Sequence, residues 1–489
     1  MQLKRKKKEM EVKQKQFWKN KRLWIISILA TADVLVFIFP SYLKNVINTE
    51  VIALNLGINP AQLAQASAVY GYVSLCIYFF GSVIADKVSL KWLTIAGLAA
   101  FGITGTWYGS VGLTAGGGII FDVENNVAVL NPIGQSSRFT QVLIIYVIWA
   151  FAKIIFWAPL WKLLSQQGKP EENGILNGIH GSLNGLIGTI FVAIGFAIFT
   201  ILTPFFVNKQ NSSTMAFSIM CYLFSSLIVL DVFLLIFFIK EKKNETISKD
   251  FNLKEVGKVL KNYKVYLVAF LVMGVYMYQQ GLSVLIPFMN SALLISASVT
   301  FVGGLLRTYL FRLFFSAPAG KIADKSGKYI KFLVIGCIIC SFIMTTIIFL
   351  PGFKIGGFQN QSKGIKILIQ VIVYSFFLCL GAICWGLVTN RWATIYEIGI
   401  DQKHYATAVG LVSVIAFSPD AWFWQLNSFF LNKHKVETEI PGVFNYQLAY
   451  QYSMILIVIG GIVGVLAGLI LMLKIKKERS IKIIKNSLS

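Results

Sequence analysis

Long apolar runs separated by short polar segments dominate this chain. A helix needs about 20 apolar residues to cross the hydrocarbon core of a bilayer. Runs of about that length or longer occupy roughly 24–43, 62–85, 92–112, 141–164, 174–204, 215–239, 265–289, 294–317, 329–351, 365–389, 404–431 and 448–473. The pattern therefore predicts an all-α integral membrane protein with twelve transmembrane helices.

The basic residues are distributed unevenly among the segments between these runs. Of the 45 Lys and Arg residues, 34 fall in the two tails and in the loops on the same side as the tails, and 8 fall in the opposite loops. The other three, Lys153, Arg307 and Arg312, lie within runs. Because Lys and Arg are enriched on the cytoplasmic side of membrane proteins, we expect both termini to be cytoplasmic.

Composition excludes several classes of protein. Hydrophobic residues make up 56% of the 489 and charged residues 13%, which is too little charge for a soluble chain of this length. The net charge of +24 comes from the loops and tails rather than from a basic domain, so no nucleic-acid partner is expected. We find no nucleophile–base pair, metal-ligand cluster or phosphate-binding loop, and we expect no enzyme activity, metal or cofactor.

One polar segment between two runs has a defined pattern, GKIADKSGK from Gly320 to Lys328. A weaker copy, GSVIADKVSLK, runs from Gly81 to Lys91. Both copies resemble the loop between the second and third helices of each half of a major facilitator superfamily transporter. The resemblance implies that these loops gate the cytoplasmic side, through Asp86, Lys87, Gly320, Asp324, Lys325, Gly327 and Lys328.

The same resemblance implies two pseudo-symmetric six-helix bundles with a substrate site between them. Asp86 and Asp324, which lie 238 positions apart, occupy corresponding places in the two halves. We therefore expect the following division: a basic cytoplasmic tail at 1–22, an N-terminal bundle at 23–240, a cytoplasmic linker at 241–263, a C-terminal bundle at 264–474 and a second basic tail at 475–489.

Ionisable residues inside a membrane span are costly and mark candidate sites. In the family, helices 1, 4, 7 and 10 line the cavity, which directs Asp33 and Lys153 toward it, with Arg307 entering from the other half. Two cations from opposite halves would suit a phosphate, carboxylate or sulfonate. Alternatively, Asp33 pairs with Lys153 and Arg307 pairs with Asp420. Asp33 and Asp420 are also candidates to carry a coupling proton, because burial favours a protonated carboxyl.

Polar residues also cluster in the run at 265–289. Tyr276, Gln279 and Gln280 precede Gly281 and Pro287, and we expect this helix to be interrupted there. Glutamines in a membrane span are costly unless they face water or a ligand, so these three side chains are candidate substrate contacts.

The loop at roughly 113–140 is unusually long for a connection between two spans. It is either a cap over the outer entrance or an insertion tolerated at the surface. The sequence leaves both interpretations open.

Together these features predict a secondary active transporter that moves a small polar, anionic metabolite by alternating access, with proton coupling or exchange. Within the superfamily the chain resembles bacterial permeases of the organophosphate–phosphate antiporter group, although that group places arginines on helices 1 and 7 and neither predicted helix has one here. A uniporter or symporter of a neutral sugar or nucleoside, and a non-transporting receptor on the same scaffold, are the alternatives. We expect a monomer in the plasma (inner) membrane of a bacterium.

Overall fold

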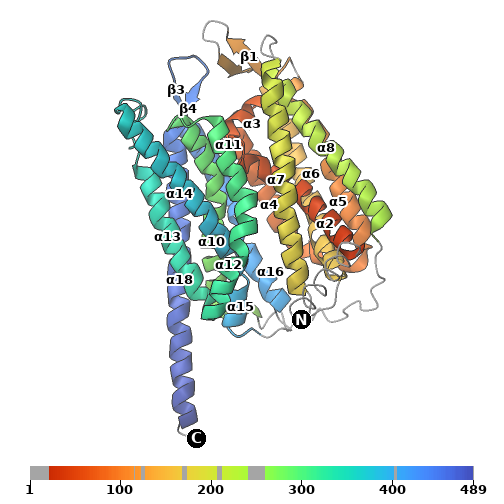
Figure 1. The fold of residues 1–489 in the computed structure, drawn as a ribbon, viewed down its shortest axis with the longest axis vertical. Coiled ribbons are helices and arrows are strands. Elements are labelled where there is room, and N and C mark those ends of the chain that lie inside the picture. Colours follow the sequence, from red (N-terminus) through yellow and green to blue (C-terminus); the bar gives the residue numbers. More distant parts are fainter. Residues whose placement is uncertain are drawn as a thin grey trace, which may run out of the picture.

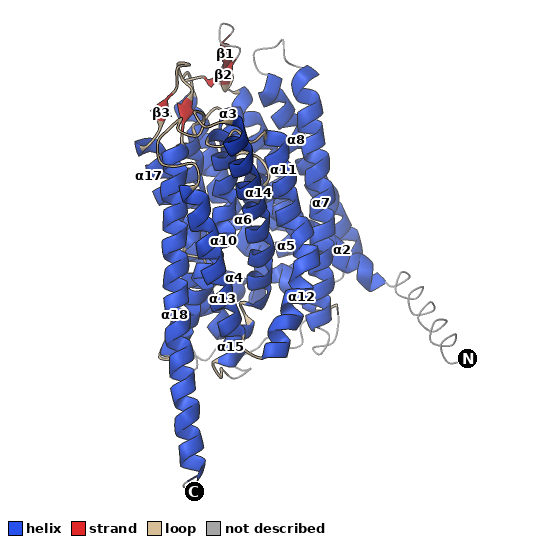
Figure 2. Ribbon diagram, turned by 60° about the vertical axis from the view of Figure 1, so that its left-hand side comes forward, coloured by secondary structure: helices blue, strands red, loops and turns tan. Residues whose placement is uncertain are grey.

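The computed structural model describes residues 21–114, 116–122, 127–167, 173–205, 212–239, 259–400 and 405–487. Nearly all of its regular structure is helix, and the short strands lie at one end (Figure 2). The all-α fold class predicted from hydropathy is confirmed.

The N-terminal half begins with a helix that changes type twice before it ends. Its elements are α2 (Lys21–Phe37), the π-helical turn η1 (Ile38–Tyr42), the 3-10 turn η2 (Leu43–Asn45), α3 (Thr49–Leu56), α4 (Pro60–Lys87), α5 (Leu90–Ser110), η3 (Val111–Leu113), β1 (Ile119–Asp122), β2 (Val127–Leu130), α6 (Gln135–Ser165), α7 (Asn173–Phe205) and α8 (Ser212–Phe238).

The C-terminal half repeats the pattern of long helices. Its elements are α10 (Tyr263–Ser291), α11 (Ala297–Leu305), the π-helical turn η5 (Leu306–Leu310), α12 (Phe311–Ser326), α13 (Tyr329–Phe349), α14 (Lys363–Asn390), α15 (Ala393–Glu397), α16 (Tyr405–Ala416), α17 (Pro419–Lys433), β3 (Val436–Glu437), β4 (Phe444–Asn445) and α18 (Gln447–Ser487).

Each predicted run coincides with one long helix or with a helix broken into consecutive segments. In the described part of the chain, eight helical stretches are long and apolar enough to cross a membrane. The other four predicted spans correspond to α4, α5, the α11–η5–α12 series and the α16–α17 pair. The protein is therefore a multi-pass membrane protein, with its helices where the hydropathy pattern placed them.

The two halves stand side by side, the red-to-yellow helices beside the green-to-blue ones (Figure 1). Two antiparallel hairpins, β1–β2 and β3–β4, lie with α3 at one end of the molecule. The described chain begins and ends at the opposite end, where α18 projects beyond the other helices. We call the hairpin end the outer end and the other the inner end.

Each half has its own apolar core, and a few residues of each half pack into the core of the other. Ala61, Ala64 and Ala68 of α4 pack into the C-terminal core. Phe301 and Tyr309 pack into the N-terminal core. The two seams between the halves are therefore α4 against α17 and α7 against the α11–η5 segment.

Contacts between the halves concentrate toward the outer end. In the described residues, α4 packs extensively along α17 and only slightly along α16. The absence of a side chain at Gly71 allows this approach, because a Cβ there would lie 2.0 Å from the backbone oxygen of Asp420. Ser428 donates a buried hydrogen bond of 2.8 Å to the Ala61 carbonyl in the same seam. The outer end is thus closed in this structure.

Three helices change geometry instead of running straight through. A π-helical turn containing Pro40 ends the first span, a second π-helical turn lies at Leu306–Leu310, and Phe417 and Ser418 separate α16 from α17. By contrast, α10 is continuous from Tyr263 to Ser291 with Pro287 inside it. The predicted interruption of this helix is therefore wrong. Pro287 has no N–H group and removes one hydrogen bond to the preceding turn, but the helix continues past it.

Candidate functional site

A cavity of about 240 Å³ lies between the two halves. It is lined by residues of both, including side chains from η1, α4, α6, α10, α12, α14 and α17. Five of the lining residues are charged: Lys44, Lys153, Arg312, Arg391 and Asp420. Its wall is also rich in aromatic rings: Phe37, Tyr42, Tyr70, Trp157, Tyr276, Trp385, Phe417 and Trp424.

Lys153 of α6 lies where the sequence predicted it, in the wall of the cavity. Its ammonium lies 5.0 Å from the ring centroid of Tyr70 and 5.8 Å from that of Phe37. Aromatic faces partly replace the water that a buried cation loses, which favours keeping the charge inside the protein.

The predicted run at 24–43 ends just before Lys44, which predicts an outer-loop position for this residue, but Lys44 lies in the cavity wall. It is buried, and its ammonium donates a hydrogen bond of 2.7 Å to Ser67 on α4. The same ammonium lies 5.1 Å from the ring of Trp424, which belongs to the other half. The π and 3-10 turns that follow Phe37 bring Lys44 inward, and only Pro40 signalled them in the sequence.

Of Arg307 and Arg312, the one that lies in the cavity wall is Arg312, on α12, and not Arg307 as the sequence predicts. Arg307 is buried but does not line the cavity, and it donates a hydrogen bond of 3.0 Å to the Asn45 carbonyl. Arg312 lines the cavity, with its guanidinium 5.2 Å from the ring of Trp385. The extra residue in the π-helical turn changes which side chains face inward after it.

The prediction that Asp33 faces the cavity is wrong, because its carboxylate lies behind the wall and is connected to it only through other side chains. It is buried and accepts a hydrogen bond of 2.6 Å from the amide nitrogen of Asn184 on α7. The amide oxygen of Asn184 accepts a bond of 2.8 Å from Arg312. His180 lies 3.9 Å from the Asp33 carboxylate. Asn184 therefore links an acid of one half to a cavity cation of the other.

Asp420, Tyr276 and Gln280 form one hydrogen-bonded cluster in the cavity wall. The Oδ1 atom of Asp420 accepts bonds from the Tyr276 hydroxyl at 2.5 Å and from the Gln280 amide at 2.6 Å. Gln279 lines the cavity beside them. In the described residues Arg307 and Asp420 have these separate partners, so the alternative in which they pair with each other is wrong.

The predicted gating residues lie at the inner end, away from the cavity. α12 continues through Gly320 and Lys325 to Ser326, and the turn follows at Gly327, where φ is +59° as a glycine allows. Lys328 precedes α13 and is exposed. The side chains of Asp86, Lys87 and Asp324 lie outside the described residues.

An acid in the same region stabilises the start of α13. The Glu397 carboxylate, on α15, accepts a hydrogen bond of 2.8 Å from the backbone N–H of Ile330. A carboxylate at a helix N-terminus pairs with otherwise unbonded N–H groups. This contact ties the inner loop to the segment before α16.

Comparison with known proteins identifies relatives over most of the chain. A protein from Mycoplasma pneumoniae, "Uncharacterized protein MG294 homolog", is 30% identical over 427 residues, 85% of each chain. The Escherichia coli "Inner membrane protein YihN" is 24% identical over 83% of this chain and 86% of its own. A solved bacterial homolog of the human lysosomal transporter Spinster, inward-facing and occupied, has a TM-score of 0.64 at 12% identity, covering 92% of this chain and 96% of its own.

The family model of the Major Facilitator Superfamily matches residues 25–423. This range covers the N-terminal half and most of the C-terminal half, including every charged residue of the cavity wall. The chain therefore belongs to the Major Facilitator Superfamily and is a transporter, not an enzyme.

Proposed function

We propose that this transporter moves a small organic anion by alternating access, and that the anion binds in the cavity between the two halves. The observation that carries the proposal is the charge of the wall. Among the described residues, four cations, Lys44, Lys153, Arg312 and Arg391, line the cavity with one carboxylate, Asp420. That carboxylate already accepts two hydrogen bonds from neutral donors, which disperse its charge.

The chemistry of these cations supports a phosphate, carboxylate or sulfonate as the charged group. Arginine presents a planar set of donors that matches such groups, and lysine adds a point charge. Lys44 and Lys153 come from the N-terminal half, and Arg312 and Arg391 come from the C-terminal half. A bound anion would be attracted to both halves at once, which favours a state in which they are close around it.

The rest of the wall supports a substrate with a carbon body rather than an inorganic ion. Aromatic rings from both halves face the cavity, among them Tyr70, Trp157 and Trp385. Such rings pack against the apolar face of a sugar or a planar group, while Gln279 and Gln280 supply hydrogen bonds. A neutral sugar or nucleoside would use these side chains but would bring no negative charge to a wall in which cations outnumber carboxylates.

Asp33 and Asp420 are the proposed coupling groups. Asp420 lies in the cavity wall, and Asp33 reaches it through Asn184 and Arg312. If Asp33 takes up a proton, its attraction for Arg312 falls, and Arg312 becomes more available to an anion. We further propose that the protein works as a monomer. We also propose that it lies in a bacterial plasma membrane, a location that the Mycoplasma and Escherichia coli relatives support.

A thermal-shift screen on the purified protein tests the substrate class. Sugar phosphates, dicarboxylates and sulfonates would be compared with neutral sugars and nucleosides at constant ionic strength. We expect stabilisation by an anion, reduced at least tenfold in apparent affinity in Lys153→Ala and Arg312→Ala. Lys433→Ala, which removes an exposed cation outside the cavity, is the matched control and should behave as wild type.

Stabilisation by neutral compounds alone would contradict the proposal, as would an anion bound equally well by all the variants. Uptake into liposomes then tests coupling. An inward proton gradient should drive accumulation by the wild-type protein, and Asp33→Asn should exchange substrate without accumulating it. Undiminished accumulation by Asp33→Asn would remove Asp33 from the coupling mechanism.

A further inference from the structure

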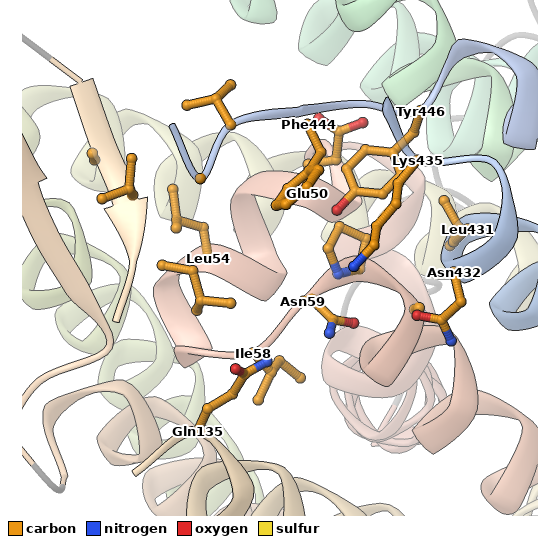
Figure 3. A pocket seen from close by; sticks show the side chains of 17 residues that line it. Glu50, Leu54, Ile58, Asn59, Gln135, Leu431, Asn432, Lys435, Phe444 and Tyr446 are labelled. Atoms are coloured by element: carbon orange, nitrogen blue, oxygen red, sulfur yellow. The ribbon is translucent and has the colours of Figure 1, made fainter. Parts of the chain in front are cut away.

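A second pocket, of about 280 Å³, lies at the outer end, separate from the central cavity (Figure 3). Its N-terminal side is formed by α3, the chain before α4 and strand β2, and its C-terminal side by the end of α17 and the β3–β4 hairpin. The two hairpins meet at this pocket, since a Cβ at Gly442 would lie 3.7 Å from Val129. The long loop predicted at 113–140 thus forms part of a pocket wall.

The polar groups on the N-terminal side of this pocket are fixed in place. Glu50 accepts a hydrogen bond of 2.7 Å from the hydroxyl of Tyr450 on α18. Asn59 and Gln62 bond each other's backbone N–H groups at the start of α4, and Gln135 donates to Gln62 at 2.8 Å. These bonds hold the floor of the pocket in one arrangement.

The pocket already contains an ammonium group, that of its own Lys435. The Lys435 Nζ atom lies 4.9 Å from the ring centroid of Phe444. In Figure 3 the side chain runs across the pocket toward Asn59, beside Tyr446. A carboxylate with aromatic rings is the environment in which proteins bind organic ammonium ions, and Glu50, Phe444 and Tyr446 all line this pocket.

We propose that the outer pocket is a binding site for a small organic ammonium ion, which takes the place of the Lys435 ammonium beside Phe444, with Glu50 as the acid of the same pocket. Lys435 is exposed and attached to the short segment between α17 and β3, so its side chain can swing out to solvent. The apolar side chains Leu54, Ile58 and Leu431 then contact the carbon body of the ligand. This proposal is independent of the substrate of the central cavity.

Because the pocket is formed by both halves at the outer end, binding there should affect the equilibrium between the outer-closed and outward-open states. Glu50 belongs to the N-terminal half, whereas Phe444 and Tyr450 belong to the C-terminal half. The complete pocket exists only while the outer ends of the halves are together. An ammonium ion bound there therefore favours the outer-closed state and slows the return to the outward-open one.

Titration of the purified full-length protein with n-butylammonium chloride, at pH 8.5 and constant ionic strength, tests the site by calorimetry and thermal shift. At this pH the Glu50 carboxyl, whose pKa burial raises to about 7, is ionised. We expect saturable binding that is at least tenfold weaker in Glu50→Gln. In Lys435→Gln, which removes the internal competitor, we expect binding at least fivefold tighter. Lys433→Gln is the matched control, because Lys433 also lies over a phenylalanine ring, 5.4 Å from Phe429, but does not line the pocket.

Neutral n-butanol and anionic butyrate, titrated in parallel, separate charge recognition from simple filling of an apolar pocket. The proposal is overturned if butanol binds as well as butylammonium, if folded Glu50→Gln binds it unchanged, or if neither the wild type nor Lys435→Gln binds it. Binding detected only in Lys435→Gln supports the proposal, since it shows that the lysine side chain occupies the same place.

Discussion

Asn184 on α7 and Arg312 on α12 are joined by a hydrogen bond of 2.8 Å that crosses from one half of the transporter to the other. The second polar atom of Asn184 donates to Asp33, so the amide is bonded at both ends. Asn184 is fully buried, and its bond to Asp33 forms away from water, whereas its bond to Arg312 reaches the cavity wall. An amide is well suited to this place because it donates to an acid and accepts from a cation at the same time.

Replacing this amide should separate the acid from the cation. In Asn184→Ala, Asp33 loses its donor, and we expect a loss of about 1–3 kcal/mol in stability together with altered anion affinity. Thermal unfolding and substrate titration measure the two effects. Ser182→Ala, at an exposed position on the same helix, is the control. Unchanged stability and affinity in Asn184→Ala would mean that the link has no energetic role.

Alanine variants of Arg307 and Arg312 should have different phenotypes. Arg312 lines the cavity, so Arg312→Ala should weaken anion binding at least tenfold, about 1.4 kcal/mol. Arg307 bonds the Asn45 carbonyl across the seam, so Arg307→Ala should change turnover while leaving anion affinity within about threefold. Substrate titration and liposome uptake distinguish the two. Equal losses of affinity would place both arginines at the substrate.

Gly71 should control closure of the outer end. A Cβ there would lie 2.0 Å from the Asp420 carbonyl oxygen, a backbone atom that cannot move aside easily. Gly71→Leu should therefore separate α4 from α17 and expose the outer side of the cavity. In a background without the native cysteines, we expect Ser67→Cys to react at least tenfold faster with a membrane-impermeant maleimide added outside.

Gly181→Leu supplies the control for this experiment, because no atom lies within 4 Å of a Cβ built at Gly181. It should leave the labelling rate unchanged. Labelling of Ser67→Cys that is equally slow in both glycine variants would show that α4 and α17 tolerate the added side chain without opening.

Asp231 should be a source of instability. It is buried on α8, and neither carboxylate oxygen has a hydrogen-bond partner among the described residues. A buried polar group without a partner costs about 1–3 kcal/mol, so Asp231→Leu should raise the unfolding temperature. Asp231→Asn keeps the buried polar atoms and should gain less. A lower unfolding temperature in Asp231→Leu would show that the carboxyl makes a stabilising interaction.

Glu50, which lies outside the membrane spans, should make stability fall as pH rises. Burial raises its pKa from 4.5 to about 7, and the hydrogen bond from Tyr450 opposes part of the rise. The folded protein then holds a proton that the unfolded chain releases above pH 4.5, so folding loses free energy between pH 4.5 and 7. Unfolding temperatures of wild type should fall relative to Glu50→Gln between pH 5 and pH 8. A constant difference would mean that Glu50 is ionised throughout.

The hydropathy pattern located the helices because crossing a membrane leaves few alternatives for the backbone. The sequence also identifies Tyr276, Gln280 and Asp420, which line the cavity, as candidate site residues, because polar residues are conspicuous in apolar runs. The pattern could not place Lys44 or distinguish Arg307 from Arg312. Both depend on π-helical turns, which shift every later side chain around the helix axis and leave little trace in a single sequence.

Asp420 takes part in two structural roles with different parts of the same residue. Its side chain lines the central cavity, and its backbone carbonyl packs against Gly71 in the α4–α17 seam that closes the outer end. We therefore expect that a solute which moves this side chain would also move the backbone that packs against α4, with no intervening residue to relay the motion. Sensing of the cargo and movement of the outer barrier would then be one mechanical event.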